Sequence, residues 1–115
     1  MSDQDDNSSE KIEKDSLKEI IDLKDAVIHT PVRLALLIFL LPRMNASFPE
    51  IQSALQLTAG NLSSHIKKLE SFGLINVDKM FIENKPTTMI QITPLGSKTI
   101  NDYATTLQNI LNNIK

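Results

Sequence analysis

The feature that most constrains the fold is a pair of short helical patterns, over 48–56 and 58–72, that are joined by a tight turn. Ser47 and Glu50 have the S-x-x-E spacing of a capping box, in which each side chain satisfies a backbone N–H group at the start of a helix. Thr58 is a suitable N-cap for the second helix. The apolar residues of that helix recur at the spacing of a half-buried helix, so one of its faces is expected to be exposed.

The exposed face of the second predicted helix is small, polar and cationic. Its centre is formed by Gly60, Ser64, Lys67 and Ser71, which lie opposite the apolar stripe at about 100° per residue. An ordinary solvated face mixes acidic with basic residues, whereas this one carries no acid before Glu70. Such a surface suits a groove that is lined by phosphates.

The composition argues against several other classes of protein. The chain of 115 residues is long enough for one domain, and it contains no Cys, which excludes disulfides, thiolate metal sites and Cys nucleophiles. The longest apolar run, 34–41, is far shorter than the roughly 18 residues that a membrane-spanning helix needs. The N-terminus is acidic, unlike a signal peptide, and no Gly-rich phosphate loop is present. We therefore expect a cytoplasmic protein that is not an enzyme, has no metal or other cofactor and does not bind a membrane.

The formal net charge of −2 is divided unevenly along the chain. Residues 1–25 hold nine acids against four lysines, whereas residues 26–115 hold eight basic groups against five acids. An acidic leader before a mildly basic body is compatible with DNA binding, but charge alone does not indicate it. We expect residues 1–9, which lack apolar side chains after Met1, to be a disordered acidic tail, and residues 10–115 to form a single domain.

Two further helices are predicted before the pair. The first covers 16–29 and begins with a second capping box. The next covers 31–41, where Thr30 is a suitable N-cap and Pro31 occupies the first helical position. It is apolar nearly all round, so we expect it to be the central buried helix. We expect Pro42 to end it, because the residue before a proline avoids the α region.

A β-hairpin and a long helix are predicted after the pair. Residues 74–93 are rich in Ile, Val, Thr and Phe and flank a polar tip at 83–86, which indicates two strands joined by a short loop. A Thr-Pro pair then starts a helix over 94–114. The predicted architecture is therefore mainly α with a small β-hairpin, an α+β fold.

The last predicted helix has an apolar seam that its own domain covers only in part. A helix of about 20 residues is near 30 Å long, roughly the diameter of a small domain, so its C-terminal half is expected to project. A second subunit is the simplest cover for the resulting apolar patch, and packing against the chain's own first helix is the alternative. The residues predicted at a dimer interface are Leu17, Ile20, Ile100, Tyr103, Leu107, Ile110, Leu111 and Ile114.

The order of elements and one run of residues resemble a known family. The run is Thr58-x-Gly60-Asn61-Leu62-Ser63-x-His65-Ile66-x-x-Leu69-Glu70-x-x-Gly73-Leu74-Ile75, closed by Thr93-Pro94-x-Gly96. It resembles the short winged-helix transcriptional regulators of bacteria and archaea, which are related to the MarR and ArsR groups. The resemblance covers roughly residues 26–103.

This resemblance implies a homodimer that binds double-stranded DNA in a sequence-specific manner and regulates transcription, as a repressor in preference to an activator. The helix over 58–72 would lie in the major groove, the wing at 82–87 would touch the backbone or the minor groove, and the terminal helices would pair the subunits. The residues assigned to DNA contact on this basis are Thr58, Gly60, Asn61, Ser63, Ser64, His65, Lys67, Lys68 and Lys85.

Two departures from the family pattern affect what the resemblance implies. Related proteins often carry two or more arginines at the wing, whereas this chain has Glu83, Asn84 and a single Lys85. The metal sites of the ArsR group use Cys or Cys/His clusters. These are absent here, and His29 has no second ligand near it in the sequence, so metal sensing is not expected.

Several of the assigned residues have a second interpretation. Gly60 either allows a close approach of the preceding helix or lets backbone N–H groups reach a phosphate. Asn61 and Ser64 either bond to DNA or are ordinary polar surface. His65 is expected to be half-buried and bonded to the backbone, in preference to contacting DNA. A competing class for the whole chain is a winged helix that binds another protein, and a small-molecule effector is compatible with DNA binding but is not identified by the sequence.

Overall fold

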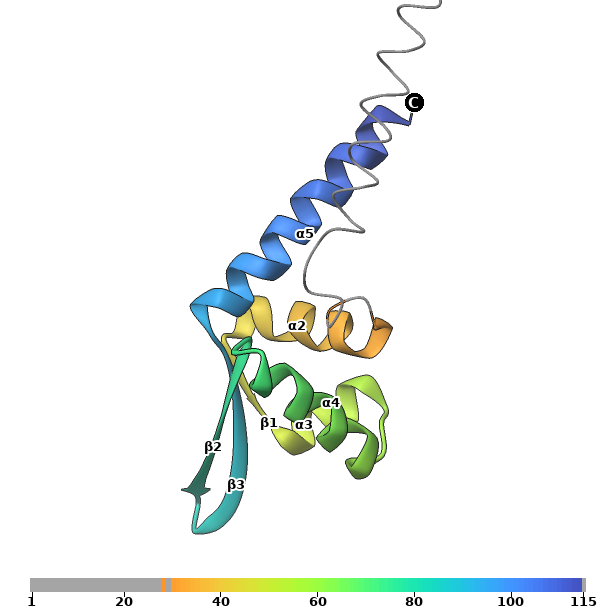
Figure 1. Ribbon diagram of the computed structural model, residues 1–115. Helices are drawn as coiled ribbons and strands as arrows, with labels where there is room; N and C mark the ends of the chain where they lie inside the picture. Colours follow the sequence, from red (N-terminus) through yellow and green to blue (C-terminus); the bar gives the residue numbers. More distant parts are fainter. Residues whose placement is uncertain (1–27, 29, 115) are drawn as a thin grey trace, which may run out of the picture. The chain divides into compact units, whose positions relative to one another are not determined.

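The computed structural model describes residue 28 and residues 30–114. The predicted tail 1–9 and helix 16–29, and with them Leu17, Ile20 and His29, lie outside this part of the chain. The elements that follow are α2 (Pro31–Arg43), β1 (Asn45–Ser47), α3 (Phe48–Leu55), α4 (Ala59–Ser71), β2 (Ile75–Ile82), β3 (Lys85–Ile92) and α5 (Pro94–Asn113) (Figure 1). The predicted α+β class, mainly helical with a small hairpin, is confirmed.

The chain divides into two compact units within α5. One unit ends at Ile100, and the stretch from Asn101 onward belongs to the other. The first unit contains α2, α3, α4 and the sheet, and its core is formed almost entirely by aliphatic side chains. The buried apolar residues are Ile28, Leu36, Leu37, Leu40, Ala46, Ile51, Leu62, Ile66, Leu69, Leu74, Ile75, Ile90, Ile92 and Ile100.

Helix α2 begins as predicted but ends later. Thr30 is its N-cap and the carbonyl oxygen of Thr30 accepts a hydrogen bond from Leu34 N at 2.9 Å. The prediction that Pro42 ends the helix is wrong, because α2 continues through Pro42 to Arg43. A proline in the last turn removes only its own N–H bond, the one that the Ile38 carbonyl would accept. One turn of side-chain support comes from Arg43, whose Nη1 donates to the Phe39 carbonyl at 2.8 Å.

The burial of α2 differs in part from the prediction. Leu36, Leu37 and Leu40 are fully buried, as expected for a central helix. Ile38, however, is 53% exposed in the single chain, so the helix is not covered all round. Three leucines at positions i, i+1 and i+4 form one apolar stripe, and this stripe is the part of α2 that supports the core.

Strand β1 was not predicted from the sequence. It contains three residues, Asn45–Ser47, and pairs antiparallel with β3 through Ala46↔Ile90 and its neighbours. The sheet has the order β1-β3-β2. Ser47 also caps α3: its Oγ accepts from Glu50 N at 3.2 Å, and the predicted capping box is confirmed. One residue thus ends a strand and starts a helix, which ties α3 to the sheet.

The β2–β3 hairpin has a tighter turn than predicted. The tip was expected to cover 83–86, but Lys85 and Pro86 belong to β3, so only Glu83 and Asn84 connect the strands. Both of these residues have positive φ, 52° and 66°, as a two-residue type I′ turn requires. Pro86 has no N–H group, but the sheet loses no hydrogen bond at this position. On the side of β2, Pro86 pairs with Phe81 in a non-hydrogen-bonded position. On the side of β1, the pairing covers only Met89–Gln91 and does not reach Pro86.

The end of α4 and the start of α5 are joined by the side chain of Thr93. Its Oγ1 donates to the Gly73 carbonyl oxygen at 2.7 Å and accepts from Gly96 N at 2.9 Å. Gly73 has φ +75°, which favours glycine after a helix. A Cβ at Gly96 would clash with the carbonyl oxygen of Leu74, so this glycine is required by close packing. The Thr-Pro-x-Gly sequence therefore has a structural role: it fixes the start of α5 against the end of α4.

Candidate nucleic-acid interface

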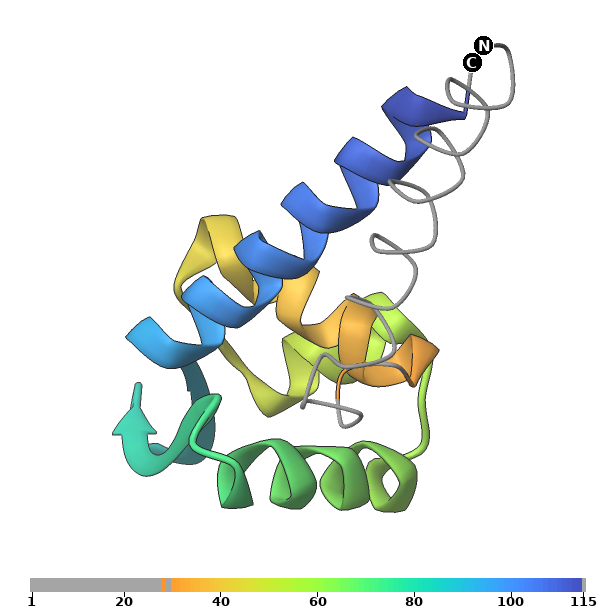
Figure 2. The same ribbon diagram turned by 45° about the horizontal axis from the view of Figure 1, so that its top comes forward.

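Helix α4 begins with the predicted cap and exposes the predicted face. The Thr58 side-chain oxygen accepts a hydrogen bond from Asn61 N at 3.1 Å. Leu62, Ile66 and Leu69 are buried, so the helix packs against the core on one side only. In Figure 2, α4 is the green helix along the lower edge, and its lower side is not covered by the other coloured elements. On α4 and its cap, the exposed residues among those predicted to bind DNA are Thr58, Gly60, Asn61, Ser64, Lys67 and Lys68, and Lys85 at the hairpin is exposed as well.

Gly60 is not required by packing. A Cβ placed on this residue would meet no atom within 4 Å, so the close approach of the preceding helix that the sequence allowed is wrong. Gly60 lies in the first turn of α4, where glycine destabilises a helix by about 0.5–1 kcal/mol relative to alanine. Open space beside a helix N-terminus leaves the backbone N–H groups accessible to an anion.

His65 is half-buried, as predicted, but its hydrogen-bond partner is a side chain and not the predicted backbone group. Its Nδ1 accepts a hydrogen bond from Arg33 Nε at 3.1 Å. Burial lowers the pKa of His65 from its ordinary value, and the positive charge of Arg33 lowers it further. An imidazole whose Nδ1 accepts this bond is neutral, with its proton on Nε2. His65 and Arg33 connect α4 to α2.

A groove of about 270 Å³ lies between α4 and the β2–β3 hairpin. It brings together two residues of the predicted DNA-binding set, Ser63 and Lys67, with Lys79 of β2, which the prediction did not include. Its lining combines three apolar side chains with both lysines and one acid. The lining residues are Phe48, Ser63, Ile66, Lys67, Glu70, Val77, Lys79 and Thr88.

The described part of the chain thus contains two packed helices, then a helix with an open polar face, then a β-hairpin. A family model for a winged helix DNA-binding domain matches residues 32–111. The chain belongs to this winged-helix family. The predicted resemblance to winged-helix regulators is thereby confirmed. In the layout of this family, α4 takes the place of the recognition helix and β2–β3 the place of the wing, and we refer to them by these two names.

Three known proteins illustrate how far the similarity extends. A transcriptional regulator homologue from Pyrococcus horikoshii OT3 is 39% identical, with a TM-score of 0.81 over 88% of this chain and 98% of that chain. An uncharacterized protein of Methanocaldococcus jannaschii is 30% identical over 89 residues, 77% of this chain and 97% of the relative. The S. aureus MepR–DNA complex shares the fold at 19% identity, with a TM-score of 0.64 over 81% of this chain and 79% of that chain.

The pairing register of the winged-helix hairpin places its two lysines, Lys79 and Lys85, on opposite faces. Residues directly opposite each other in an antiparallel ladder point to the same face, and successive residues alternate. Lys79, which pairs with Thr88, therefore shares a face with the half-buried Val77 and lies in the groove beside α4. Lys85 pairs with Ile82 and lies on the opposite face. The spacing of two residues between Val77 and Lys79 on a predicted strand was the signal that could have identified Lys79 from the sequence.

Three basic residues outside the groove have partners inside the winged-helix domain. Arg33 donates to His65, and the guanidinium of Arg43 lies 3.8 Å from the centre of the Phe39 ring. The Lys68 ammonium lies 5.4 Å from the centre of the Phe72 ring, a weak cation–π contact that leaves it exposed. Lys67 and Lys68 are thus the exposed cations of the recognition helix.

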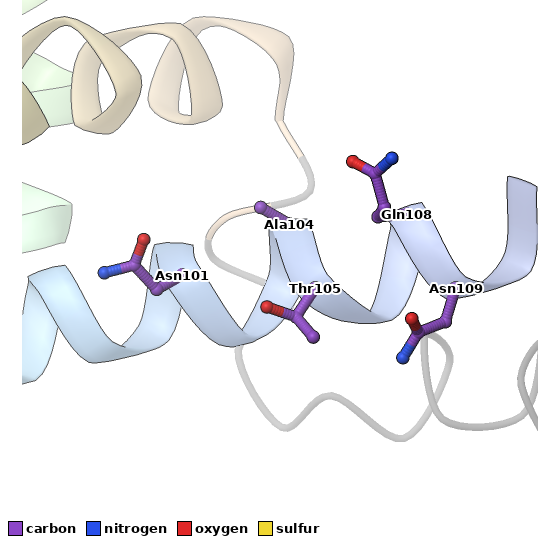
Figure 3. A pocket seen from close by; sticks show the side chains of 5 residues that line it. All are labelled: Asn101, Ala104, Thr105, Gln108 and Asn109. Atoms are coloured by element: carbon purple, nitrogen blue, oxygen red, sulfur yellow. The ribbon is translucent and has the colours of Figure 1, made fainter. Parts of the chain in front are cut away.

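The residues predicted at a dimer interface have mixed exposure in the single winged-helix chain. Ile100 and Ile110 are buried and Tyr103 is half-buried, whereas Leu111 and Ile114 are 54% and 63% exposed. Leu107 is also exposed. A different side of α5 is polar and uncharged: Figure 3 shows the residues that line a shallow hollow of about 220 Å³ there, which are Asn101, Ala104, Thr105, Gln108 and Asn109.

Other kinds of site are not evident in the winged-helix structure. Over residue 28 and residues 30–114, no three His, Asp or Glu side chains gather in a way that could hold a metal ion. No helix in this same part of the chain has the length and apolar character to cross a membrane. A small apolar hollow of about 190 Å³ is lined by Pro31, Val32, Ala35, Leu55 and Leu57. It contains no charged or hydrogen-bonding side chain that would orient a ligand.

Proposed function

We propose that this protein is a cytoplasmic transcriptional regulator that binds double-stranded DNA in a sequence-specific manner as a homodimer. The observation that carries the proposal is the open face of α4, which exposes small polar and basic residues and has no acid before Glu70. Regulation would be by repression, with the bound dimer blocking access to the promoter. The printed name of the relative from Pyrococcus horikoshii OT3, a transcriptional regulator homologue, supports the same assignment.

The recognition helix offers separate groups for reading bases and for binding the backbone. Asn61 and Ser64 are exposed one turn apart, and an amide such as that of Asn61 can form two hydrogen bonds with adenine in the major groove. Lys67 and Lys68 would neutralise phosphates and so set affinity more than sequence preference. The open space at Gly60 would admit a phosphate to the helix N-terminus.

The homodimer is supported by the exposed apolar residues of α5. Leu107, Leu111 and Ile114 recur at intervals of four and three, the seam spacing of paired helices, and all three are exposed in the single chain. A two-fold dimer predicts a pseudo-palindromic operator with half-sites about 34 Å apart, one turn of B-DNA. The MepR–DNA complex, whose fold this chain shares, supports DNA as the partner.

The test is fluorescence anisotropy with a labelled duplex from the region upstream of the protein's own gene, measured at several salt concentrations. The variants are Lys67→Glu, Lys68→Glu and the double variant. The charge-matched control is Lys98→Glu, at an exposed position of α5 outside the predicted DNA-binding set, and circular dichroism checks that each variant is folded. We expect binding by the wild type that strengthens at low salt, collapses in the double variant and is largely kept in the control. Flat curves for wild type and variants at about 50 mM salt would overturn the proposal and leave a protein partner as the alternative.

A further inference from the structure

We propose that the wing ends in an apolar wedge, formed by Phe81 and backed by Pro86, that inserts into the minor groove of the bound duplex. This inference rests on the proposed function, since it concerns how the wing engages DNA. It assigns the wing contact to residues other than Lys85, which the sequence had singled out.

The wing tip exposes an unusual amount of apolar surface. Three successive large hydrophobic residues precede the turn, Met80, Phe81 and Ile82, and all three are exposed. Phe81 is 76% exposed, more than any other large hydrophobic side chain in the described part of the chain. Single exposed apolar residues are common on proteins, but three at the tip of one hairpin, with Phe81 on one face and Met80 and Ile82 on the other, indicate a binding surface.

The backbone makes this tip narrow and isolated. Glu83 and Asn84 form a two-residue turn, and β1 pairs only with Met89–Gln91, so the distal part of the wing has just two strands. Figure 1 shows the turn at the end of the hairpin, away from α3 and α4. Pro86 has no N–H group, so the free edge of β3 near the tip is a poor template for another strand. These features favour insertion of a side chain over pairing with a second sheet at that edge.

The face on which Phe81 lies connects it to the recognition helix. Lys79 and Phe81 are two residues apart on β2, so they share a face, and Lys79 lines the groove together with Lys67 of α4. Two residues of a strand span about 7 Å, close to the roughly 6 Å width of the minor groove. Lys79 could therefore reach a phosphate at the groove edge while Phe81 enters the groove. Basic residues beside an inserted apolar side chain are the arrangement by which minor-groove proteins unstack a base step and kink DNA.

The opposite face of the hairpin provides a matched control. Met80 is exposed, pairs with Thr87 and points away from the face of Phe81. The variants are Phe81→Ala, Phe81→Leu and Met80→Ala. Each is compared with the wild type by anisotropy on the duplex used above, and by energy transfer between dyes on the two ends of that duplex. Circular dichroism and sedimentation of the free proteins accompany both measurements.

We expect Phe81→Ala to weaken binding about tenfold, the scale of one lost base–aromatic contact, with an unchanged salt slope because no charge is removed. The bend that wild type produces should be lost in Phe81→Ala, partly kept in Phe81→Leu and fully kept in Met80→Ala. Equal affinity and bending for Phe81→Ala and wild type would overturn the wedge while leaving the proposed function intact. A lower sedimentation coefficient for free Phe81→Ala would also overturn it, because the tip would then belong to an interface between copies. Failure of the wild type to bind the duplex would instead contradict the proposed function itself.

Discussion

Nδ1 of His65 accepts a hydrogen bond from Nε of Arg33 at 3.1 Å, and this bond joins the recognition helix α4 to α2 across 32 positions of sequence. The bond requires an imidazole whose Nδ1 carries no proton. Protonation would replace an attractive contact by the repulsion of two cations. We therefore expect the attachment of the recognition helix to the helical core to depend on pH.

Stability should fall as the pH is lowered through the titration of His65. Burial and the charge of Arg33 lower the pKa of His65 below its unfolded value of 6.5. Between the two pKa values the unfolded chain binds more protons, so this contribution to stability is fully present above about pH 6.5 and is lost as the pH falls toward the folded pKa. Urea unfolding of wild type and His65→Gln at pH 7.5 and pH 5.5 measures it. If the two proteins lose the same stability between these pH values, His65 is not the group responsible.

Gly60→Ala should separate stability from DNA binding. The added Cβ meets no atom within 4 Å, so the fold should gain about 0.5–1 kcal/mol from the better helix former. DNA affinity should nevertheless fall, because the methyl group occupies the space by which a phosphate reaches the backbone N–H groups. Thermal unfolding and anisotropy on the same preparation check both parts. A more stable protein with undiminished affinity would show that no phosphate approaches Gly60.

Thr93→Val should destabilise the first compact unit by roughly 1–3 kcal/mol. Valine keeps the shape of threonine but removes the hydroxyl that donates to Gly73 and accepts from Gly96, leaving both backbone groups without that partner. Thr93→Ser retains the hydroxyl and is the control. Chemical denaturation followed by circular dichroism measures the difference. Similar unfolding midpoints for the valine and serine variants would show that the methyl contact, and not the hydrogen bonds, matters at this position.

The two lysines of the wing should differ in their effect on DNA affinity. Lys79 faces the groove beside Lys67, whereas Lys85 lies on the other face of the hairpin. Lys79→Ala should lower the slope of log affinity against log salt by about 1, the effect of one lost phosphate contact. Lys85→Ala should change the slope less. Anisotropy titrations over a salt series distinguish them, and the reverse order would place the DNA on the outer face of the wing.

Local signals made most of the helices predictable from the sequence. A capping box such as Ser47 with Glu50 is closed by atoms three residues apart, so its residues can be recognised without knowing the rest of the fold. The cap at Thr58 and the Thr93-Pro94 start of α5 are equally local. The same locality explains why the boundaries of α3, α4 and α5 agree with the predictions to within one residue.

What the sequence did not predict depends on partners that are distant in the chain. Strand β1 is too short to show an alternating pattern and exists because β3 pairs with it. The bond between Arg33 and His65 and the groove position of Lys79 likewise require the packed arrangement of three elements. The end of α2 was missed for another reason: the effect of Pro42 is a bias, which the contacts of the last turn overcome.

The sheet order β1-β3-β2 leaves β2 at an edge within the described residues. An edge strand with three large apolar side chains near its end is a template for self-association, and charged residues such as Asp78 and Lys79 are the usual protection against it. We therefore expect the wing to limit the colloidal stability of the DNA-free protein. Concentrated solutions of the protein should aggregate through this hairpin first. Adding a duplex that covers the tip should prevent this aggregation.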